Sequence, residues 1–128
     1  MSLEVGTGAA LEVVEAEDLD ACLDEIERTL TEPTLVMLAN GDATMHIGLG
    51  DLTHSIALFL DRDGRCWASS GTETTAVLVF RSGDTCHDFY PSTAIPTDQA
   101  RLAAREFAAT GRQPTTITWR QEPGQRHA

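Results

Sequence analysis

Residues 34–69 read TLVMLANGDATMHIGLGDLTHSIALFLDRDGRCWAS, and this stretch decides the fold. Short runs of β-branched and apolar residues alternate here with turn-forming residues at the spacing of hairpins. Gly, Asn and Asp at the breaks tolerate positive φ or hydrogen bond to their own backbone. The pattern predicts an antiparallel meander with strands at 34–39, 44–49, 55–60 and 65–69.

The same pattern extends in both directions from this stretch. Two more β-prone runs follow at 76–81 and 86–90, separated from their neighbours by turns at 70–72 and 82–84. We expect them to continue the meander. A short edge strand is predicted at 11–15, and a last strand at 115–120 carries Trp119.

Two helices are predicted on either side of the meander. The first follows a cap at Asp18 or Asp20 and stops before Pro33, with an apolar stripe of Leu19, Cys22, Leu23, Ile26 and Leu30. The second has Thr97 as its N-cap, Asp98 in its first turn and Gly111 as a left-handed stop. Its stripe consists of Ala100, Ala103, Ala104, Phe107 and Ala108.

These elements predict an α+β fold in a single domain over residues 10–121. We expect a mostly antiparallel sheet of about six to eight strands with two helices packed on it. Residues 1–9 are small and glycine-bearing, so they are expected to form a flexible N-terminus, and 122–128 a polar tail.

The charge balance points to a protein partner and away from nucleic acid. Twenty acidic residues stand against nine basic ones, the net charge is -11, and every base is an arginine. The arginines are scattered, whereas phosphate binding needs a clustered basic surface. A basic protein is a better electrostatic match, although surplus acid also simply keeps small proteins dispersed.

Cysteine usage and hydropathy favour a location in the reducing cytoplasm. Its three cysteines form no CxxC pair, and residues 1–10 have neither a basic region nor a long apolar run typical of a signal peptide. The longest apolar stretch, near residues 57–60, is far shorter than the roughly 20 residues that span a bilayer. We expect no membrane association.

Cys86-His87-Asp88 contains the residue types of a thiol nucleophile, its base and an orienting acid. Successive side chains of a strand point to opposite faces, so His87 would point away from the other two and the set would not converge. The sequence therefore favours a protein that is not an enzyme.

The sequence predicts no metal or cofactor site. His46 and His54 could ligate a metal with Cys66 or Cys86, but no HxxxH or CxxC spacing organises them. Residues 48–51 lack the lysine and following helix of a phosphate loop. Residues 61–64 resemble the start of a calcium loop, but Thr72 stands where its last ligand, a glutamate, is needed.

Three stretches resemble the immunity protein family 1 of bacterial polymorphic toxin systems, over roughly residues 30–121. They are 45–50 (MHIGLG), 66–71 (CWASSG) and, most specifically, Ile95-Pro96 followed by Ala100, Glu106-Phe107, Thr110-Gly111, Pro114 and Trp119. The resemblance implies a protein that binds a toxin encoded beside it in the cytoplasm of the producing cell. The resemblance also implies that the toxin is often a nucleic-acid deaminase. It assigns no catalytic role to any residue of this chain.

The motif residues are expected to be structural. Phe107 and Trp119 would pack the second helix on the sheet, Gly111 would supply a left-handed backbone, and Pro114 would rigidify the connection.

The partner surface is expected to be acidic, because a nucleic-acid-modifying toxin must present a positive groove. Residues 1–32 hold ten of the twenty acids and only one base. We expect carboxylates of the first helix or of the following turn to steer association, with Trp67 as a core residue or an interface anchor. The candidate residues are Asp20, Asp24, Glu25, Glu27, Asp61, Asp63 and Trp67.

Two other functions stay open at the level of sequence. A small adaptor or chaperone for a secreted effector would share the size and acidity, but it would bind an unfolded segment. A hydrolase or redox enzyme would use Cys86 or Cys66 and need a thiol of depressed pKa. Homodimerisation is also left open.

Overall fold

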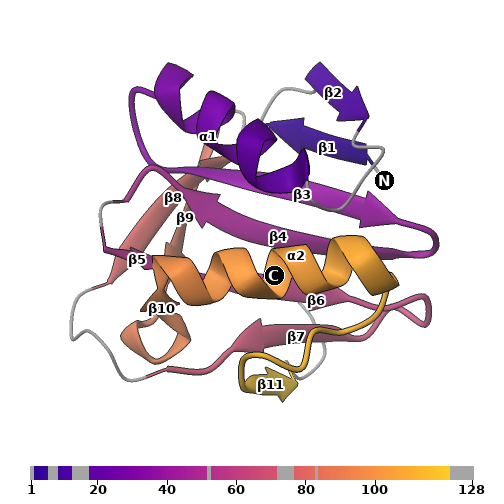
Figure 1. Cartoon of the computed structure of the whole chain (residues 1–128). Coiled ribbons are helices and arrows are strands. Elements are labelled where there is room, and N and C mark those ends of the chain that lie inside the picture. The colour runs from indigo at the N-terminus through magenta and orange to yellow at the C-terminus, as the bar shows by residue number, and fades with distance from the viewer. Residues whose placement is uncertain are drawn as a thin grey trace.

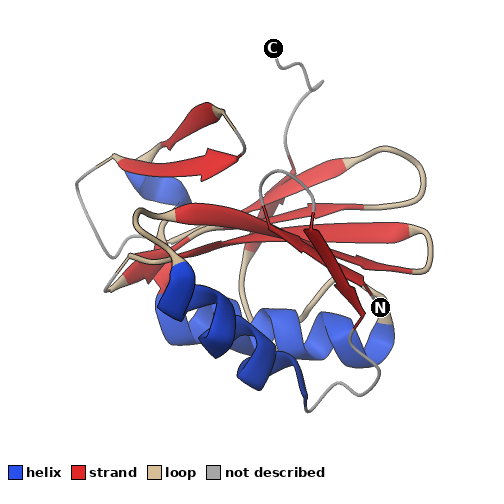
Figure 2. Ribbon diagram, turned by 90° about the horizontal axis from the view of Figure 1, so that it is seen from above, coloured by secondary structure: helices blue, strands red, loops and turns tan. Residues whose placement is uncertain are grey.

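The computed structural model describes residues 2–5, 9–12, 18–51, 53–71, 77–82 and 84–121. Two helices lie on one face of a curled sheet (Figures 1 and 2), which confirms the predicted single α+β domain. The elements are β1 Ser2–Val5, β2 Ala9–Glu12, α1 Leu19–Thr29, β3 Thr34–Asn40, β4 Ala43–Leu49, β5 His54–Ser55, β6 Ala57–Leu60, β7 Cys66–Ser69, β8 Leu78–Ser82, β9 Thr85–Phe89, a 3-10 turn Pro91–Thr93, β10 Ile95–Pro96, α2 Thr97–Thr110 and β11 Trp119–Gln121.

The predicted meander forms the middle of the sheet. Seven strands follow the order β11-β7-β6-β4-β3-β1-β2, and β3, β4, β6 and β7 are successive antiparallel neighbours. In the register, Val36 lies opposite Ile47 and Met45 opposite Phe59. Because strand side chains alternate, these apolar residues share the face that the helices cover.

The predicted strand at 55–60 is divided between two sheets. Ser55 pairs with Ile95 of β10, whereas β6 begins at Ala57 and pairs with β4. The buried Ser55 hydroxyl donates to the Gly48 carbonyl at 2.7 Å, and the Gly48 amide donates to Ser55 Oγ at 3.0 Å. These side-chain hydrogen bonds take the place of regular strand pairing at Gly48 on the β6 side. The predicted strand is therefore interrupted at Ile56, while the Gly48 backbone groups keep hydrogen-bond partners.

The interpretation of one continuous meander is wrong beyond β7. The β8–β9 hairpin returns to the start of β3, and β8 pairs with β3 in parallel at Arg81 and Thr34. The neighbour of β7 on its other side is β11. The reason is apolar packing on the face away from the helices. Phe80 and Leu78 of β8 are buried there with Leu35, Ile56 and Ala94.

The structure contains an N-terminal strand that sequence analysis did not predict. Within the stretch expected to be a flexible N-terminus, β1 lies between β2 and β3 and pairs Leu3 with Leu38. Leu3 is fully buried in the main core. The predicted strand at 11–15 overlaps β2 at residues 11–12. Its remainder, like the predicted tail at 122–128, lies outside the described residues.

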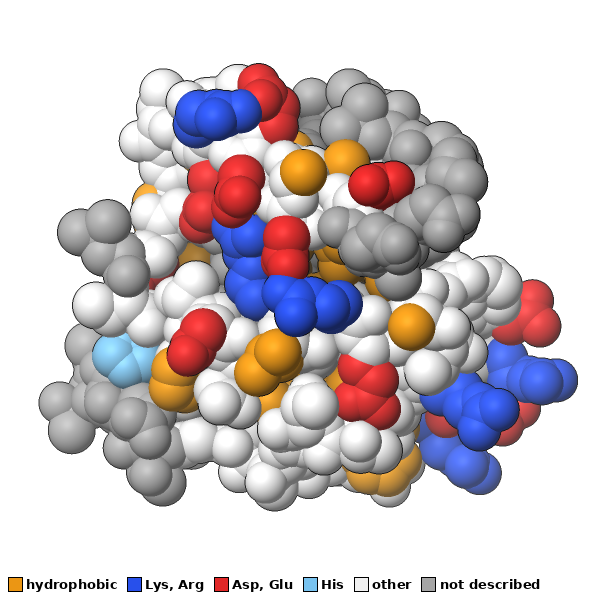
Figure 3. Space-filling model, in the orientation of Figure 1, with side chains coloured by type: hydrophobic (Ala, Val, Ile, Leu, Met, Phe, Trp, Pro, Cys, Tyr) orange, Lys and Arg blue, Asp and Glu red, His pale blue; other side chains and the backbone are white. Residues whose placement is uncertain are grey.

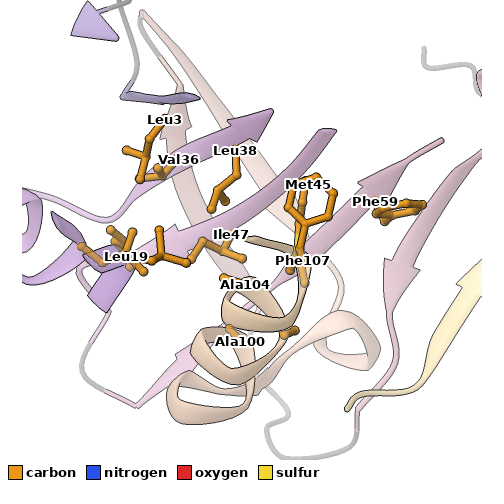
Figure 4. Close-up of a cluster of buried hydrophobic side chains, with 14 of the residues drawn as sticks. Leu3, Leu19, Val36, Leu38, Met45, Ile47, Phe59, Ala100, Ala104 and Phe107 are labelled. Carbon is orange, nitrogen blue, oxygen red and sulfur yellow. The ribbon is translucent and has the colours of Figure 1, made fainter. Parts of the chain in front are cut away.

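The two helices bury their predicted stripes against the sheet (Figure 4). In α1, which ends before Pro33 as expected, Leu19, Leu23 and Ile26 are buried. In α2 the small side chains of the stripe allow a close approach, and the Phe107 ring meets Phe59 edge to face at 5.9 Å between centroids.

The ends of α2 and the last strand differ in part from the predictions. Gly111 is left-handed at φ 70°, as predicted, but the N-cap is Pro96 and Thr97 is already helical. The cause is the β10 pairing, which holds Pro96 extended opposite His54. The strand predicted at 115–120 begins only at Trp119 because the preceding residues form a loop.

Candidate partner-binding surfaces

The motif that follows α2 closes a loop around the end of the helix. Glu106 accepts hydrogen bonds from the Thr115 amide at 2.9 Å and the Thr115 hydroxyl at 3.0 Å. The Gly111 amide donates to the Phe107 carbonyl at 2.8 Å, which ends the helix in the left-handed conformation. Glu106 therefore ties the C-terminal part of α2 to the middle of the loop that follows it.

Burial and hydrogen bonds to the sheet side hold the rest of this loop. Pro114 is fully buried, and its carbonyl accepts a hydrogen bond from Trp119 Nε1 at 2.8 Å. Asn40 Nδ2 donates to the carbonyls of Phe107 and Ala108, at 3.1 and 3.2 Å, and so satisfies the end of α2. Glu106, Trp119 and Asn40 thus make these hydrogen bonds within the fold.

Three of the four predicted acids of α1 are paired with arginines of α2. Arg101, whose side chain is only 16% exposed, lies 3.0 Å from Asp24, 2.8 Å from Glu27 and 3.5 Å from Asp20. Arg105 forms a second ion pair with Asp20. Figure 3 shows arginine side chains lying between carboxylates over α1 and α2. We call this set of five residues the helix seam.

The helix seam leaves only part of the α1 charge available to a partner. The side chains of Asp20 and Glu27 are about one-third exposed beside their arginines, whereas Asp24 is 63% exposed. Glu25 is 66% exposed and pairs with Arg28 of its own helix. Asp24 and Glu25 are therefore the most accessible of the four predicted α1 acids.

The second predicted group lies at another end of the molecule. Asp61 and Asp63 stand in the turn between β6 and β7, and Trp67 is in β7. Asp61 Oδ1 accepts hydrogen bonds from the amides of Asp63 and Arg65, both at 2.9 Å, so it stabilises the turn. Trp67 is half-buried against the main core. Figure 1 places α1 near β1 and β3, so the two groups form separate surfaces.

A groove of about 590 Å³ separates the β8–β9 hairpin from the sheet. Leu35, His46 and Leu58 line it from the sheet, and Ser82 and residues 86–89 line it from the hairpin. Burial lowers the pKa of His46, and the charge that His87 can carry lowers it further. Both effects favour the neutral form of His46.

Cys86, His87 and Asp88 do not converge in this groove. Cys86 lies opposite Arg81 and Asp88 opposite Val79, whereas His87 lies opposite the buried Phe80. Strand alternation thus separates the base from the nucleophile and the acid. Over the described ranges, no group of three or more His, Cys, Asp or Glu side chains is placed to hold a metal ion.

The turn at 48–51 has a structural explanation. Asp51 Oδ1 accepts hydrogen bonds from the amides of Thr53 at 3.0 Å and His54 at 2.9 Å. Burial opposes ionisation of this carboxyl, but the hydrogen bonds outweigh it and lower the pKa of Asp51. A carboxylate stands here where a phosphate loop would need cationic or amide groups facing the ligand.

Sequence reasoning missed an exposed apolar patch on the β8–β9 hairpin. Val77 is 56% exposed, Val79 45% and Tyr90 77%. We call these three residues and Asp88, which pairs with Val79, the hairpin patch. The run Val77-Leu78-Val79-Phe80 is apolar on both faces, and a half-buried strand would alternate. That run was the available signal.

Comparison with protein families matches residues 7–121 to the model for Immunity protein Imm1. The chain belongs to the Imm1 immunity protein family. A comparison with curated proteins finds no match. The match covers the resemblance noted in the sequence, including the loop after α2 that Glu106 and Trp119 hold in this Imm1 member. Neither α1 nor α2 is long and apolar enough to cross a membrane, and no other helix of the described residues is either.

Proposed function

We propose that this protein neutralises a cognate toxin by binding it directly, without catalysis of its own. The observation that carries the proposal is the Imm1 family match over residues 7–121. The proposed partner is the toxic domain encoded beside it, a basic, nucleic-acid-modifying enzyme such as a deaminase. Binding takes place in the cytoplasm of the producing cell and covers the groove that holds the toxin's substrate.

Electrostatics supports a basic partner. The protein carries a net charge of -11, and an enzyme that holds a polyanion must present positive charge around its active site. Opposite fields accelerate encounter, and an acidic protein competes for the same groove as the nucleic acid.

The accessible acids of α1 and of the β6–β7 turn are the proposed steering charges. On α1 these are Asp24 and Glu25, because Asp20 and Glu27 are partly covered in the helix seam. On the turn, Asp63 is exposed, whereas Asp61 is occupied with backbone amides. Steering sets the association rate, and tight holding requires a desolvated centre elsewhere.

The test is protection and complex formation with the adjacent toxin domain. Cells that express the toxin domain are expected to survive only when this protein is co-expressed. The purified protein should also form a stable complex with a folded, catalytically inactive toxin domain, which separates an immunity protein from a chaperone of unfolded segments. A protein that neither protects nor binds would refute the proposal.

A further inference from the structure

The hairpin patch concentrates exposed apolar surface that the fold does not use. Leu78 and Phe80 of β8 point inward and are buried, so Val79 between them points outward. Val77 directly precedes this strand and is also exposed. Leu78 pairs with Phe89 at the end of the ladder, and Val77 and Tyr90 are the residues that directly flank this pair in the chain. Three of the five large apolar side chains that are exposed among the described residues therefore lie together on this hairpin.

Packing and a backbone hydrogen bond hold the chain beneath the hairpin patch in place. Phe80 is buried against Gly48 of β4, where a Cβ atom would collide with its ring, and Phe89 packs on Phe80 at 6.1 Å between centroids. Behind Tyr90, the Thr93 amide donates to the Tyr90 carbonyl at 2.9 Å, which fixes the chain in the 3-10 turn. An aromatic side chain held on a fixed backbone loses little conformational entropy on binding.

The charges around the patch select a cationic partner. Asp88 belongs to the patch, and Asp84 is exposed in the turn of the same hairpin. The one arginine of the hairpin, Arg81, is ion-paired with Glu32. A second copy of this chain would bring like charges together, whereas a partner with lysine or arginine beside an apolar pocket would pair with them.

We infer that the hairpin patch is the surface that docks the toxin domain, with the Tyr90 ring as its central anchor. The partner it fits is a protein surface with an apolar pocket bordered by basic side chains. Val77 and Val79 would exclude water around the ring, and Asp88 would pair with a cation at the edge. The inference rests on the proposed function and gives it a location: the side of the sheet away from the helices (Figure 2).

The test compares patch variants with a matched variant elsewhere. Tyr90→Ala and Val79→Ser alter the patch, and Leu102→Ala removes a similarly exposed apolar side chain, at 41%, from α2. Binding to the inactive toxin domain of the adjacent gene is measured by titration calorimetry. Tyr90→Ala should weaken the affinity by about 30-fold or more, the scale of an interface hot spot. Leu102→Ala should stay within about threefold of wild type.

The outcomes separate the inference from the proposed function. If wild type binds the toxin domain and both patch variants bind equally well, the docking surface is wrong and the proposed function stands. If wild type does not bind, both fall. If sedimentation shows a wild-type dimer that Tyr90→Ala dissociates while toxin affinity is unchanged, the patch joins two copies of this chain and the inference is overturned. Melting curves that match wild type show that the variants are folded.

Discussion

Arg101 makes three of the four ion pairs that join the described residues of α1 and α2. It is the least exposed member of the helix seam, and it lies within 3.5 Å of three carboxylates that come from α1. Removal of its charge would leave Asp20, Asp24 and Glu27 facing one another with less compensation. The α1 acids that a sequence suggests as a free negative surface are therefore partly structural.

Replacement of Arg101 by methionine should lower the free energy of unfolding by roughly 1–3 kcal/mol, because hydrogen bonds to charged groups are lost at a poorly exposed site. The matched control is Arg28→Met. Arg28 and Glu25 are 70% and 66% exposed, and an exposed pair of this kind contributes about 0.5 kcal/mol or less. Urea unfolding at low salt measures both. Equal losses in the two variants would contradict the structural role of Arg101.

His46 makes the stability of the protein depend on pH. Its pKa in the folded protein lies below the ordinary value of 6.5, because burial and the neighbouring His87 disfavour its charged form. As the pH falls below that ordinary value, the unfolded chain takes up the proton first. The contribution of His46 to the free energy of unfolding is therefore lost as the solution becomes acidic, and it is unchanged above neutral pH.

We expect His46→Gln to flatten the fall in stability between pH 7 and pH 5. Thr44→Ser, a change on the same face of β4 that adds no titrating group, should leave that fall unchanged. Chemical unfolding at a series of pH values measures the difference, and an NMR titration of the His46 ring reports its pKa directly. A wild-type and a His46→Gln curve that remain parallel over this range would show the prediction to be wrong.

At the scale of elements, one close contact joins the β8–β9 hairpin to β4. Phe80 is 1% exposed and lies where a Cβ on Gly48 would have to be. Gly48→Ala should therefore displace the ring and lower the free energy of unfolding by about 1–3 kcal/mol. A smaller side chain in place of Phe80 should relieve the collision.

A double-mutant cycle with Phe80→Leu tests this contact. The second substitution should cost less in the Gly48→Ala background than in wild type, because the collision has gone. Hydrogen exchange of the β8 and β9 amides should locate the loosening in this hairpin. Strictly additive effects would mean that Gly48 and Phe80 act independently.

Local chemistry explains which elements could be predicted. Turn residues and period-2 runs predicted β3, β4 and β7, and Gly111 predicted the end of α2. The return of β8 to β3 could not be predicted, because it depends on the burial of Phe80 against residues far away in the chain. The pairing of β1 depends in the same way on Leu3 fitting beside Leu38.

At the scale of the whole molecule, the distribution of charge matters more than its sum. The family and the acidic character followed from the sequence, but the pairing of α1 acids with Arg101 and Arg105 did not, since 81 or more residues separate Asp20 from either partner. In the folded protein, three of the α1 carboxylates form ion pairs with arginines of α2. The fold leaves Asp24 and Glu25 as the outward charges of α1.

Two variants of equal charge should separate steering from stability. Asp24→Asn with Glu25→Gln should slow association with the toxin domain by roughly three- to tenfold at low salt, with a melting temperature close to that of wild type. Asp20→Asn with Glu27→Gln should mainly lower the melting temperature. Stopped-flow association at two salt concentrations and thermal melting measure the two effects. An unchanged rate for the first variant would exclude α1 as the steering surface.

The return of the β8–β9 hairpin to β3 has a consequence for the order in which the protein folds. The strands β3, β4, β6 and β7 meet one another over short stretches of chain, whereas β8 closes a much longer loop before it reaches β3. We expect the β8–β9 hairpin to acquire its native surroundings after these four strands have paired. A freshly made molecule would then reach its native secondary structure before it can recognise a partner through Tyr90.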